Sequence, residues 1–280
     1  MRFLSYISIM AKNLDQKGIK YIFNRYDLFF IDLWGVVHNG IELYENSIEV
    51  LDNLAAAKKD FILLTNAPRP NATVINFLKK IGLKKYFENV FTSGEAAYKY
   101  LISELNKKKF FHIGPPRDFD LFKNIENNNV LNIGDADYIL CTGLFDDQEN
   151  DLNYYKDLLL NHVSKKMICT NPDLIVDRGE KREYCAGSVA KSFEEIKGKV
   201  IYFGKPHPPV YNLSTTIKNK SVLCIGDNLN TDIKGANVQN FDSLLITNGI
   251  HRKEILDLKL EEVLKKYQTK VDYIQRSLKW

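Results

Sequence analysis

The sequence predicts an α/β protein built on a mostly parallel sheet. Short apolar runs of four to six residues each end in a polar or glycine cluster, which is typical of strands buried on both faces. Between several of these runs, apolar residues recur at the spacing of an amphipathic helix. Strands that alternate with helices form βαβ units, and the strands of such units lie parallel.

These elements follow one another along the chain. Two helices are expected, over 48–59 and 73–83. In the first, Ile48, Leu51 and Leu54 recur at helical spacing. The predicted strands occupy residues 28–32, 61–65, 89–92, 200–204, 222–227 and 243–247.

The middle of the chain differs from its flanks. It contains an Asn-rich patch and a second set of apolar runs, at 138–142 and 167–170. We interpret residues 108–197 as a separate α/β domain inserted into the first one. The first domain would then consist of residues 1–107 and 198–280.

Composition narrows the class of protein. The 280 residues include 39 Lys and Arg and 35 Asp and Glu, a net charge of +4 without a long basic block, so we expect no nucleic-acid partner. No apolar run reaches about 18 residues, so we expect no membrane span. The four cysteines lack metal or redox spacing, which favours a reducing, cytoplasmic location. We expect the apolar first residues, 1–11, to form an amphipathic helix, with a signal peptide as the alternative.

Carboxylates follow two of the predicted strands, at the sheet edge where ligands bind in parallel α/β folds. Asp32 ends the first strand ahead of a tight turn at Gly35, and can act as a nucleophile or a metal ligand. The alternative for Asp32 is a residue that caps a loop. Asp227 and Asp232 form an acidic loop suited to a hard cation, and helix capping is compatible with that role.

Phosphate-binding side chains follow two other strands. Thr65 and Asn66 can hydrogen-bond phosphate oxygens, or only cap the next helix. Lys205, in a loop stiffened by prolines, offers a point charge for phosphate, with a solvated surface lysine as the alternative. An acid, a hydroxyl–amide pair, a lysine and an acidic loop, in this order, together predict Mg²⁺, phosphate and a carboxylate nucleophile.

The order of these four motifs resembles that of the haloacid dehalogenase-like (HAD) superfamily of hydrolases. Its signatures are an Asp nucleophile, a Thr or Ser, a Lys and a terminal acidic motif. The resemblance covers residues from about 25 to 250 and favours class IIA, which holds 4-nitrophenylphosphatase-like and nucleotide monophosphatase-like enzymes. It rests on the strings TSGEAA (92–97), NPD (171–173), AGS (186–188) and GDNLNTDI (226–233).

The resemblance implies a Rossmann-like HAD core with a parallel sheet and a mobile, inserted α/β cap of class II. It implies that Asp32 attacks phosphorus and forms an aspartyl-phosphate. Mg²⁺ would be held by Asp32, the carbonyl of Trp34 and Asp227, with Asp232 close by. The enzyme would be a Mg²⁺-dependent phosphatase that hydrolyses a phosphoric monoester or acyl phosphate.

By the same resemblance, Thr65, Asn66 and Lys205 would hold the transferring phosphoryl group of a small phosphorylated molecule. Class IIA caps often mediate dimers, which favours a homodimer. Arg178, Arg182 and Tyr184 are candidate contacts for an anionic or ring-bearing substrate, with solvated side chains as the alternative.

The sequence departs from the family at one position. Most phosphatases of this family carry a second Asp two residues after the nucleophile, which protonates the leaving alcohol, and here that residue is Trp34. General acid–base catalysis is worth about 10²–10⁴-fold, so alkyl phosphates should suffer most. We hypothesise that His38 partly replaces the missing acid, with a packing histidine as the alternative.

Two other functions remain open because of Trp34. One is a dehalogenase-like displacement on Asp32, since a halide leaves without a proton. The other is a catalytically impaired protein that binds a phosphate ligand without turnover. Release of phosphate would separate a phosphatase from both.

Overall fold

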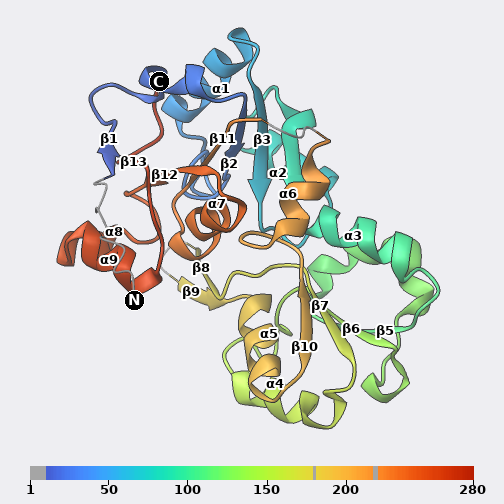
Figure 1. Ribbon diagram of the computed structural model, residues 1–280. Coiled ribbons are helices and arrows are strands. Elements are labelled where there is room, and N and C mark those ends of the chain that lie inside the picture. Colours follow the sequence, from blue (N-terminus) through green and yellow to red (C-terminus); the bar gives the residue numbers. More distant parts are fainter. Residues whose placement is uncertain (1–10, 179–180, 217–219) are drawn as a thin grey trace, which may run out of the picture. The chain divides into compact units, whose positions relative to one another are not determined.

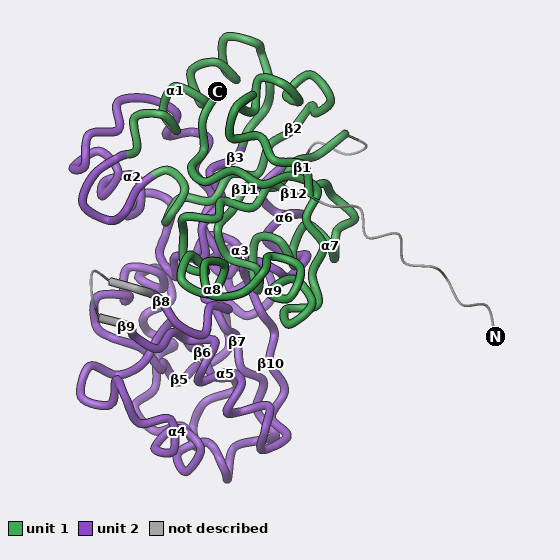
Figure 2. The backbone as a smooth tube through the Cα atoms, turned by 90° about the vertical axis from the view of Figure 1, so that its left-hand side faces the viewer, with its two compact units in different colours: residues 1–37, 44–61, 220–280 green, residues 38–43, 62–219 purple. Residues whose placement is uncertain are grey.

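The computed structural model describes residues 11–178, 181–216 and 220–280 (Figure 1). Most of the predicted N-terminal helix therefore lies outside the described residues. The chain divides into two compact units (Figure 2). Unit 1 consists of the chain up to Val37, Tyr44–Phe61 and Lys220–Trp280, and unit 2 consists of His38–Leu43 and Ile62–Asn219.

Unit 1 is built on a parallel sheet. Its central strands β2 and β11 are apolar throughout, apart from a terminal glycine, and are buried on both faces. The register pairs Ile31 with Ile225, so the two strands end level and the residues after them share one edge. The order is β1 (Lys12–Asn13), β13 (Tyr273–Gln275), β12 (Asp242–Ile246), β11 (Val222–Gly226) and β2 (Leu28–Ile31).

Helices cover the sheet of unit 1 and complete its core. Helix α9 (Leu260–Tyr267) buries Val263, which packs with Leu229, Ile233, Leu245 and Val271. Short 3-10 turns at Ile19–Tyr21 and Phe23–Arg25 precede β2, and a π-helical turn, Leu229–Ile233, follows β11. The remaining helices are α1 (Glu45–Ala56), α7 (Lys234–Gln239) and α8 (Arg252–Asp257).

Unit 2 contains a strand pair and a second parallel sheet. Strand β3 (Asp60–Thr65), most of which belongs to this unit, pairs in parallel with β4 (Val90–Thr92). The second sheet has the order β10 (Lys199–Tyr202), β7 (Lys166–Cys169), β6 (Tyr138–Cys141) and β5 (Phe110–Ile113). Strands β8 (Ile175–Arg178) and β9 (Lys181–Tyr184) pair with each other in antiparallel orientation and form a hairpin.

The helices of unit 2 bury apolar faces against these strands. Helix α5 (Ala186–Glu195) packs Val189, Ala190 and Phe193 into a core shared with α4 (Leu152–Leu159) and the second sheet. The segment after β5 forms a kinked run of 3-10 turns, Pro116–Asn128. The others are α2 (Asn71–Lys80), α3 (Ser93–Glu104) and α6 (Pro208–Ser214), with short 3-10 turns at Phe87–Asn89, Ile133–Asp135 and Leu160–His162.

The predicted fold class, α/β with parallel sheets, is confirmed. Within the described residues, each strand and helix predicted from residue 28 onward is present within a few residues of its expected bounds. One pairing differs from expectation. Strand β10, which the prediction groups with the first domain, pairs with β7 and so extends the second sheet past residue 197. The bounds of 108 and 197 for an inserted domain stay a prediction.

Candidate active site

Three carboxylates of unit 1 gather at the carboxyl ends of β2 and β11. Asp32 follows β2, whereas Asp227 and Asp232 follow β11. One oxygen from each lies within 4.8 Å of the other two, and all three side chains are buried. The level ends of the two strands explain this convergence, because residues that follow paired parallel strands meet at one edge of the sheet.

The backbone around Asp227 leaves room only for glycine. Gly35 has a φ of +83°, a conformation that residues with a Cβ adopt at a cost. A Cβ on Gly35 would lie 2.3 Å from Oδ2 of Asp227, inside van der Waals contact. The turn after Asp32 therefore brings the backbone of Gly35 so close to the side chain of Asp227 that a larger residue would clash there.

Main-chain groups orient two of the carboxylates. The N–H of Ile250 donates to Oδ2 of Asp227 at 2.9 Å, and the N–H of Asn228 donates to Oδ2 of Asp232 at 3.1 Å. His251 supports the same loop, because its Nε2 accepts from the N–H of Leu229 at 3.2 Å. Burial lowers the pKa of His251, which keeps the ring neutral with Nε2 as an acceptor.

The cluster fits a hard divalent cation. Three ionised carboxylates this close together repel one another in a buried setting. A cation such as Mg²⁺ removes that repulsion and takes oxygen ligands of this kind. The structure thus brings together Asp32, Asp227 and Asp232, while the predicted role of the Trp34 carbonyl stays a prediction. The indole of Trp34 is 36% exposed, although Leu33 and Val36 beside it are buried.

Unit 2 brings together the predicted phosphate-binding residues. Asn66 and Lys205 are hydrogen-bonded to each other: the Lys205 N–H donates to Asn66 Oδ1 at 2.7 Å, and Asn66 Nδ2 donates to the Lys205 carbonyl at 3.0 Å. Thr65 precedes them at the end of β3, and its Oγ1 accepts from the N–H of Ala67 at 3.2 Å. All three predicted residues are buried.

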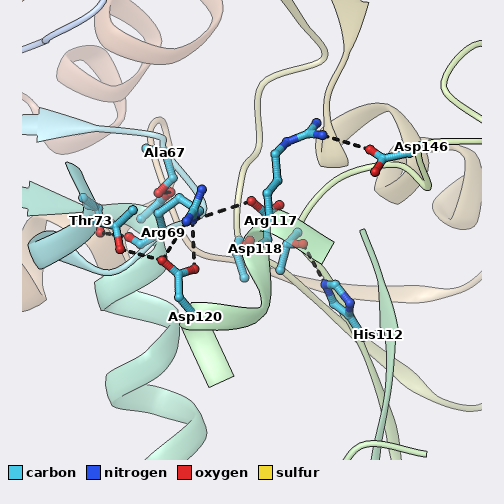
Figure 3. A network of polar contacts seen from close by, with 12 residues as sticks. Ala67, Arg69, Thr73, His112, Arg117, Asp118, Asp120 and Asp146 are labelled. Carbon is cyan, nitrogen blue, oxygen red and sulfur yellow. Dashed lines mark hydrogen bonds and ion pairs between the residues drawn. The ribbon is translucent and has the colours of Figure 1, made fainter. Parts of the chain in front are cut away.

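The loop that follows Asn66 is fixed by an arginine. Figure 3 shows Arg69 between Asp120 and Asp118, two carboxylates of the 3-10 segment after β5. The guanidinium donates to both oxygens of Asp120, each at 2.8 Å, and Nε lies 3.7 Å from Oδ1 of Asp118. The Arg69 carbonyl accepts from Thr92 Oγ1 at 2.6 Å. This bidentate pair anchors the loop that carries Thr65 and Asn66.

A buried polar chain continues from Asp118 toward β5 (Figure 3). Nε2 of His112 lies 2.8 Å from Oγ1 of Thr142, which also hydrogen-bonds Asp118. Burial lowers the pKa of His112 to about 3 and raises the pKa of Asp118 to about 6. By contrast, Arg117 and Asp146 form an exposed ion pair at 2.8 Å.

His38 is a buried, neutral side chain. Its ring packs edge-on against Phe77, with the centroids 5.5 Å apart, and its Nδ1 accepts from the N–H of Gly40 at 2.9 Å. Burial lowers its pKa to about 4, so the ring carries no charge at pH 7. These contacts are those of a packing residue, and the acid–base role of His38 stays a prediction.

The segment 171–188 gives one residue that the sequence analysis did not single out. Asp173 accepts a hydrogen bond from Asn66 Nδ2 at 3.1 Å. Its position in the NPD string next to a strand end was the available signal. Tyr184 is 41% exposed, whereas the side chains of Arg178 and Arg182 lie outside the described residues. Sequence reasoning also missed Arg69 and His251. Their hydrogen-bond partners, Asp120 and the N–H of Leu229, are distant in the chain, so no local pattern points to either pair.

Comparison with known proteins identifies the family. Residues 29–127 match a family model described as haloacid dehalogenase-like hydrolase, and residues 202–279 match a second HAD-like hydrolase model. A crystal structure of a haloacid dehalogenase-like hydrolase from Brucella suis 1330 is 33% identical, with a TM-score of 0.76, over 84% of this chain and 94% of that one. The chain belongs to the haloacid dehalogenase-like hydrolases.

Curated relatives place the chain within the family. A protein of Bacillus subtilis named 5'-nucleotidase YutF is 23% identical over 82% of this chain and 90% of its own length. A 4-nitrophenylphosphatase of Schizosaccharomyces pombe is 24% identical over 88% of this chain and 92% of its own. The predicted family and its 4-nitrophenylphosphatase-like branch are therefore confirmed, as is the fold of a HAD core with a cap. Among the described residues, no helix has the length and apolar character needed to cross a membrane.

Proposed function

We propose that this hydrolase is a phosphatase that uses Mg²⁺ and Asp32 to remove phosphate from a small phosphorylated molecule. The observation that carries the proposal is the buried cluster of Asp32, Asp227 and Asp232 in a HAD-like hydrolase. Relatives named as phosphatases and a nucleotidase support the same reaction class.

The described residues include side chains that could bind the cation such a reaction needs. Asp32, Asp227 and Asp232 would hold the cation, with the Trp34 carbonyl as a further oxygen ligand. The bound cation would supply charge neutralisation for the phosphoryl oxygens. Phosphoryl transfer depends mostly on positioning and on charge stabilisation.

In the proposed reaction, a carboxylate oxygen of Asp32 bonds to phosphorus as the bond to the leaving oxygen breaks. The electron pair of that bond stays on the leaving oxygen. A water then attacks phosphorus, releases the Asp32 carboxylate and loses a proton. Thr65 would donate a hydrogen bond to the phosphoryl group, and Lys205 would contribute its positive charge.

Trp34 restricts the leaving group. An indole cannot give a proton to an alkoxide, and the loss of an acid is worth about 10²–10⁴-fold in rate. Acyl and aryl phosphates need little or no proton, because their leaving groups are stable as anions. We therefore propose turnover in the order acyl, then aryl, then alkyl phosphate.

Phosphate release with Mg²⁺ from acetyl phosphate, 4-nitrophenyl phosphate and glycerol phosphate tests the proposal. We expect that order of rates, and their loss in Asp32→Asn, which keeps the shape of the side chain but removes its charge. Release of halide without phosphate would favour displacement on Asp32. Binding of Mg²⁺ and phosphate without turnover would favour a phosphate-binding protein.

Two further proposals concern the cellular location and the oligomeric state of the enzyme. Its four cysteines are free thiols in the structure, which fits a reducing, cytoplasmic location. We also propose a homodimer, which light scattering of the purified protein would test.

A further inference from the structure

The carboxamide of Asn66 is the centre of a hydrogen-bonded clasp in unit 2. Its Oδ1 accepts from the main-chain N–H of Lys205 at 2.7 Å. Its Nδ2 donates to the main-chain carbonyl of Lys205 at 3.0 Å and to Oδ1 of Asp173 at 3.1 Å. Since a main-chain N–H only donates and a carbonyl only accepts, these partners fix which end of the carboxamide is oxygen.

These contacts use both N–H groups of the Asn66 side chain. A carboxamide has two donor hydrogens, and here one goes to Lys205 and one to Asp173. No side-chain N–H remains for a phosphate oxygen. Asn66 therefore fits a residue that holds the main chain of Lys205 better than one that binds phosphate through its side chain.

Asp173 is itself held in place by its own segment. Its N–H donates to Oδ1 of Asn171 at 3.0 Å, and its carbonyl accepts from the N–H of Gly187 at 3.2 Å, at the start of α5. The preceding Pro172 lies against Gly204, where a Cβ would be 2.5 Å from the proline Cδ. The main chain of Asp173 is therefore held on both sides of the residue that contacts Asn66.

The charge of Asp173 distinguishes positioning from ligand binding. A carboxylate repels a phosphate anion, so direct binding of phosphate does not explain its place beside Asn66 and Lys205. An ionised carboxylate is, however, a strong acceptor for an amide N–H. Together with the main chain of Lys205, it favours the orientation in which Oδ1 of Asn66 faces the N–H of Lys205.

We propose that Asp173 is a positioning residue, which orients the Asn66 carboxamide so that Asn66 sets the main chain of Lys205 and thereby its ammonium group for phosphate. The inference rests on the proposed function, in which Lys205 binds the phosphoryl group. It assigns a role in phosphate binding to the segment 171–173.

The test compares two substitutions at Asp173. Asp173→Asn removes the charge but keeps an oxygen that can accept from Asn66 Nδ2, whereas Asp173→Ala removes both. Binding of inorganic phosphate in the presence of Mg²⁺ is measured by calorimetry, which does not need turnover. We expect Asp173→Asn to bind within about threefold of wild type and Asp173→Ala about tenfold or more weakly, the effect of a lost hydrogen bond to a charged group.

Two controls accompany this pair. Asp146→Ala makes the same change at an exposed ion pair, and its phosphate affinity and thermal midpoint should match those of wild type. Lys205→Met tests whether Asp173 acts on phosphate binding through Lys205. Because Asp173 acts through Lys205, adding Asp173→Ala to Lys205→Met should weaken phosphate binding little further.

Several outcomes would overturn the inference. Tighter binding in both Asp173 variants would show that only its charge matters. Equal affinity of Asp173→Ala and wild type would show that the clasp does not position Lys205. Loss of turnover in both variants with unchanged phosphate binding would make Asp173 an acid or base. A wild-type protein that neither binds nor releases phosphate would refute the proposed function, and the inference would fall with it.

Discussion

Asp118 should reduce the stability of the folded protein at neutral pH, and Asp118→Asn should restore it. The side chain is only 5% exposed, and burial raises its pKa from 3.8 to about 6. A hydrogen bond from Thr142 and the charges of Arg69 and Arg117 act in the opposite direction but do not outweigh the burial. The folded protein therefore holds a proton on Asp118 at a pH where the unfolded chain has lost it.

The size and sign of the effect follow from this difference. Between 3.8 and about 6 the pKa values differ by about 2, which corresponds to about 3 kcal/mol. The folded state binds the proton of Asp118 more tightly than the unfolded state does. The stabilisation that this proton gives is fully present below about pH 4. It is lost as the pH rises through about 6. At pH 7, Asp118→Asn should unfold with a free energy up to about 3 kcal/mol higher than wild type, and at pH 4 the two should be similar.

Urea titrations at pH 4 and pH 7 measure the effect as a difference between variant and wild type. Asp120→Asn, two residues away, is the matched control with the opposite sign. Although burial raises the pKa of Asp120, hydrogen bonds from Arg69 and Thr73 outweigh it and lower the pKa. Asp120→Asn should therefore destabilise the protein at both pH 4 and pH 7, because a lowered pKa keeps the stabilisation by this carboxylate present above about 3.8. If Asp118→Asn lowers stability at pH 7, the ionised carboxylate is stabilised by its partners and the reasoning is refuted.

Three further predictions concern the carboxylate cluster and His38. Gly35→Ala should weaken Mg²⁺ binding by about tenfold or more, because the strained φ and the contact with Asp227 cost on the order of 1–3 kcal/mol; unchanged affinity in calorimetry would contradict the close approach. Removal of divalent cations by a chelator should abolish phosphate release, and added Mg²⁺ should restore it; activity that survives complete removal would rule out the metal. His38→Ala should lower the thermal midpoint through lost packing on Phe77 and leave the pH–rate profile between pH 5 and 8 unchanged, because burial holds the His38 pKa at about 4. A lost limb in that profile would instead support the acid–base role.

The strands and the carboxylate cluster could be predicted from the sequence for one physical reason. Strands such as β2 and β11 are buried on both faces, so they appear as unbroken apolar runs. Parallel pairing then brings the residues after them to one edge, which is how Asp32 and Asp227 could be placed together.

What the sequence could not provide is the partner of each strand and side chain. Strand β10 has the same apolar character as the strands of unit 1, yet it pairs with β7, because a local pattern does not encode its neighbour. The hairpin of β8 and β9 contains charged residues and carries no clear period. The second N–H group of the Asn66 side chain has its hydrogen-bond acceptor in Asp173, which lies 107 residues away in the chain.

The exposed indole of Trp34 bears on what the enzyme can hydrolyse. The side chains proposed for the reaction all act as the nucleophile, as ligands of the cation or on the phosphoryl group, and they are Asp32, Asp227, Asp232, Thr65 and Lys205. None of them needs to give a proton to the leaving oxygen, and burial keeps His38 neutral. The barrier that remains for an alkyl phosphate is therefore the cost of expelling an unprotonated alkoxide, which charge neutralisation at phosphorus does not remove. The leaving group of an acyl or aryl phosphate is stable as an anion and needs no proton. Because Trp34 cannot donate a proton, the proposed enzyme depends on substrates with such leaving groups.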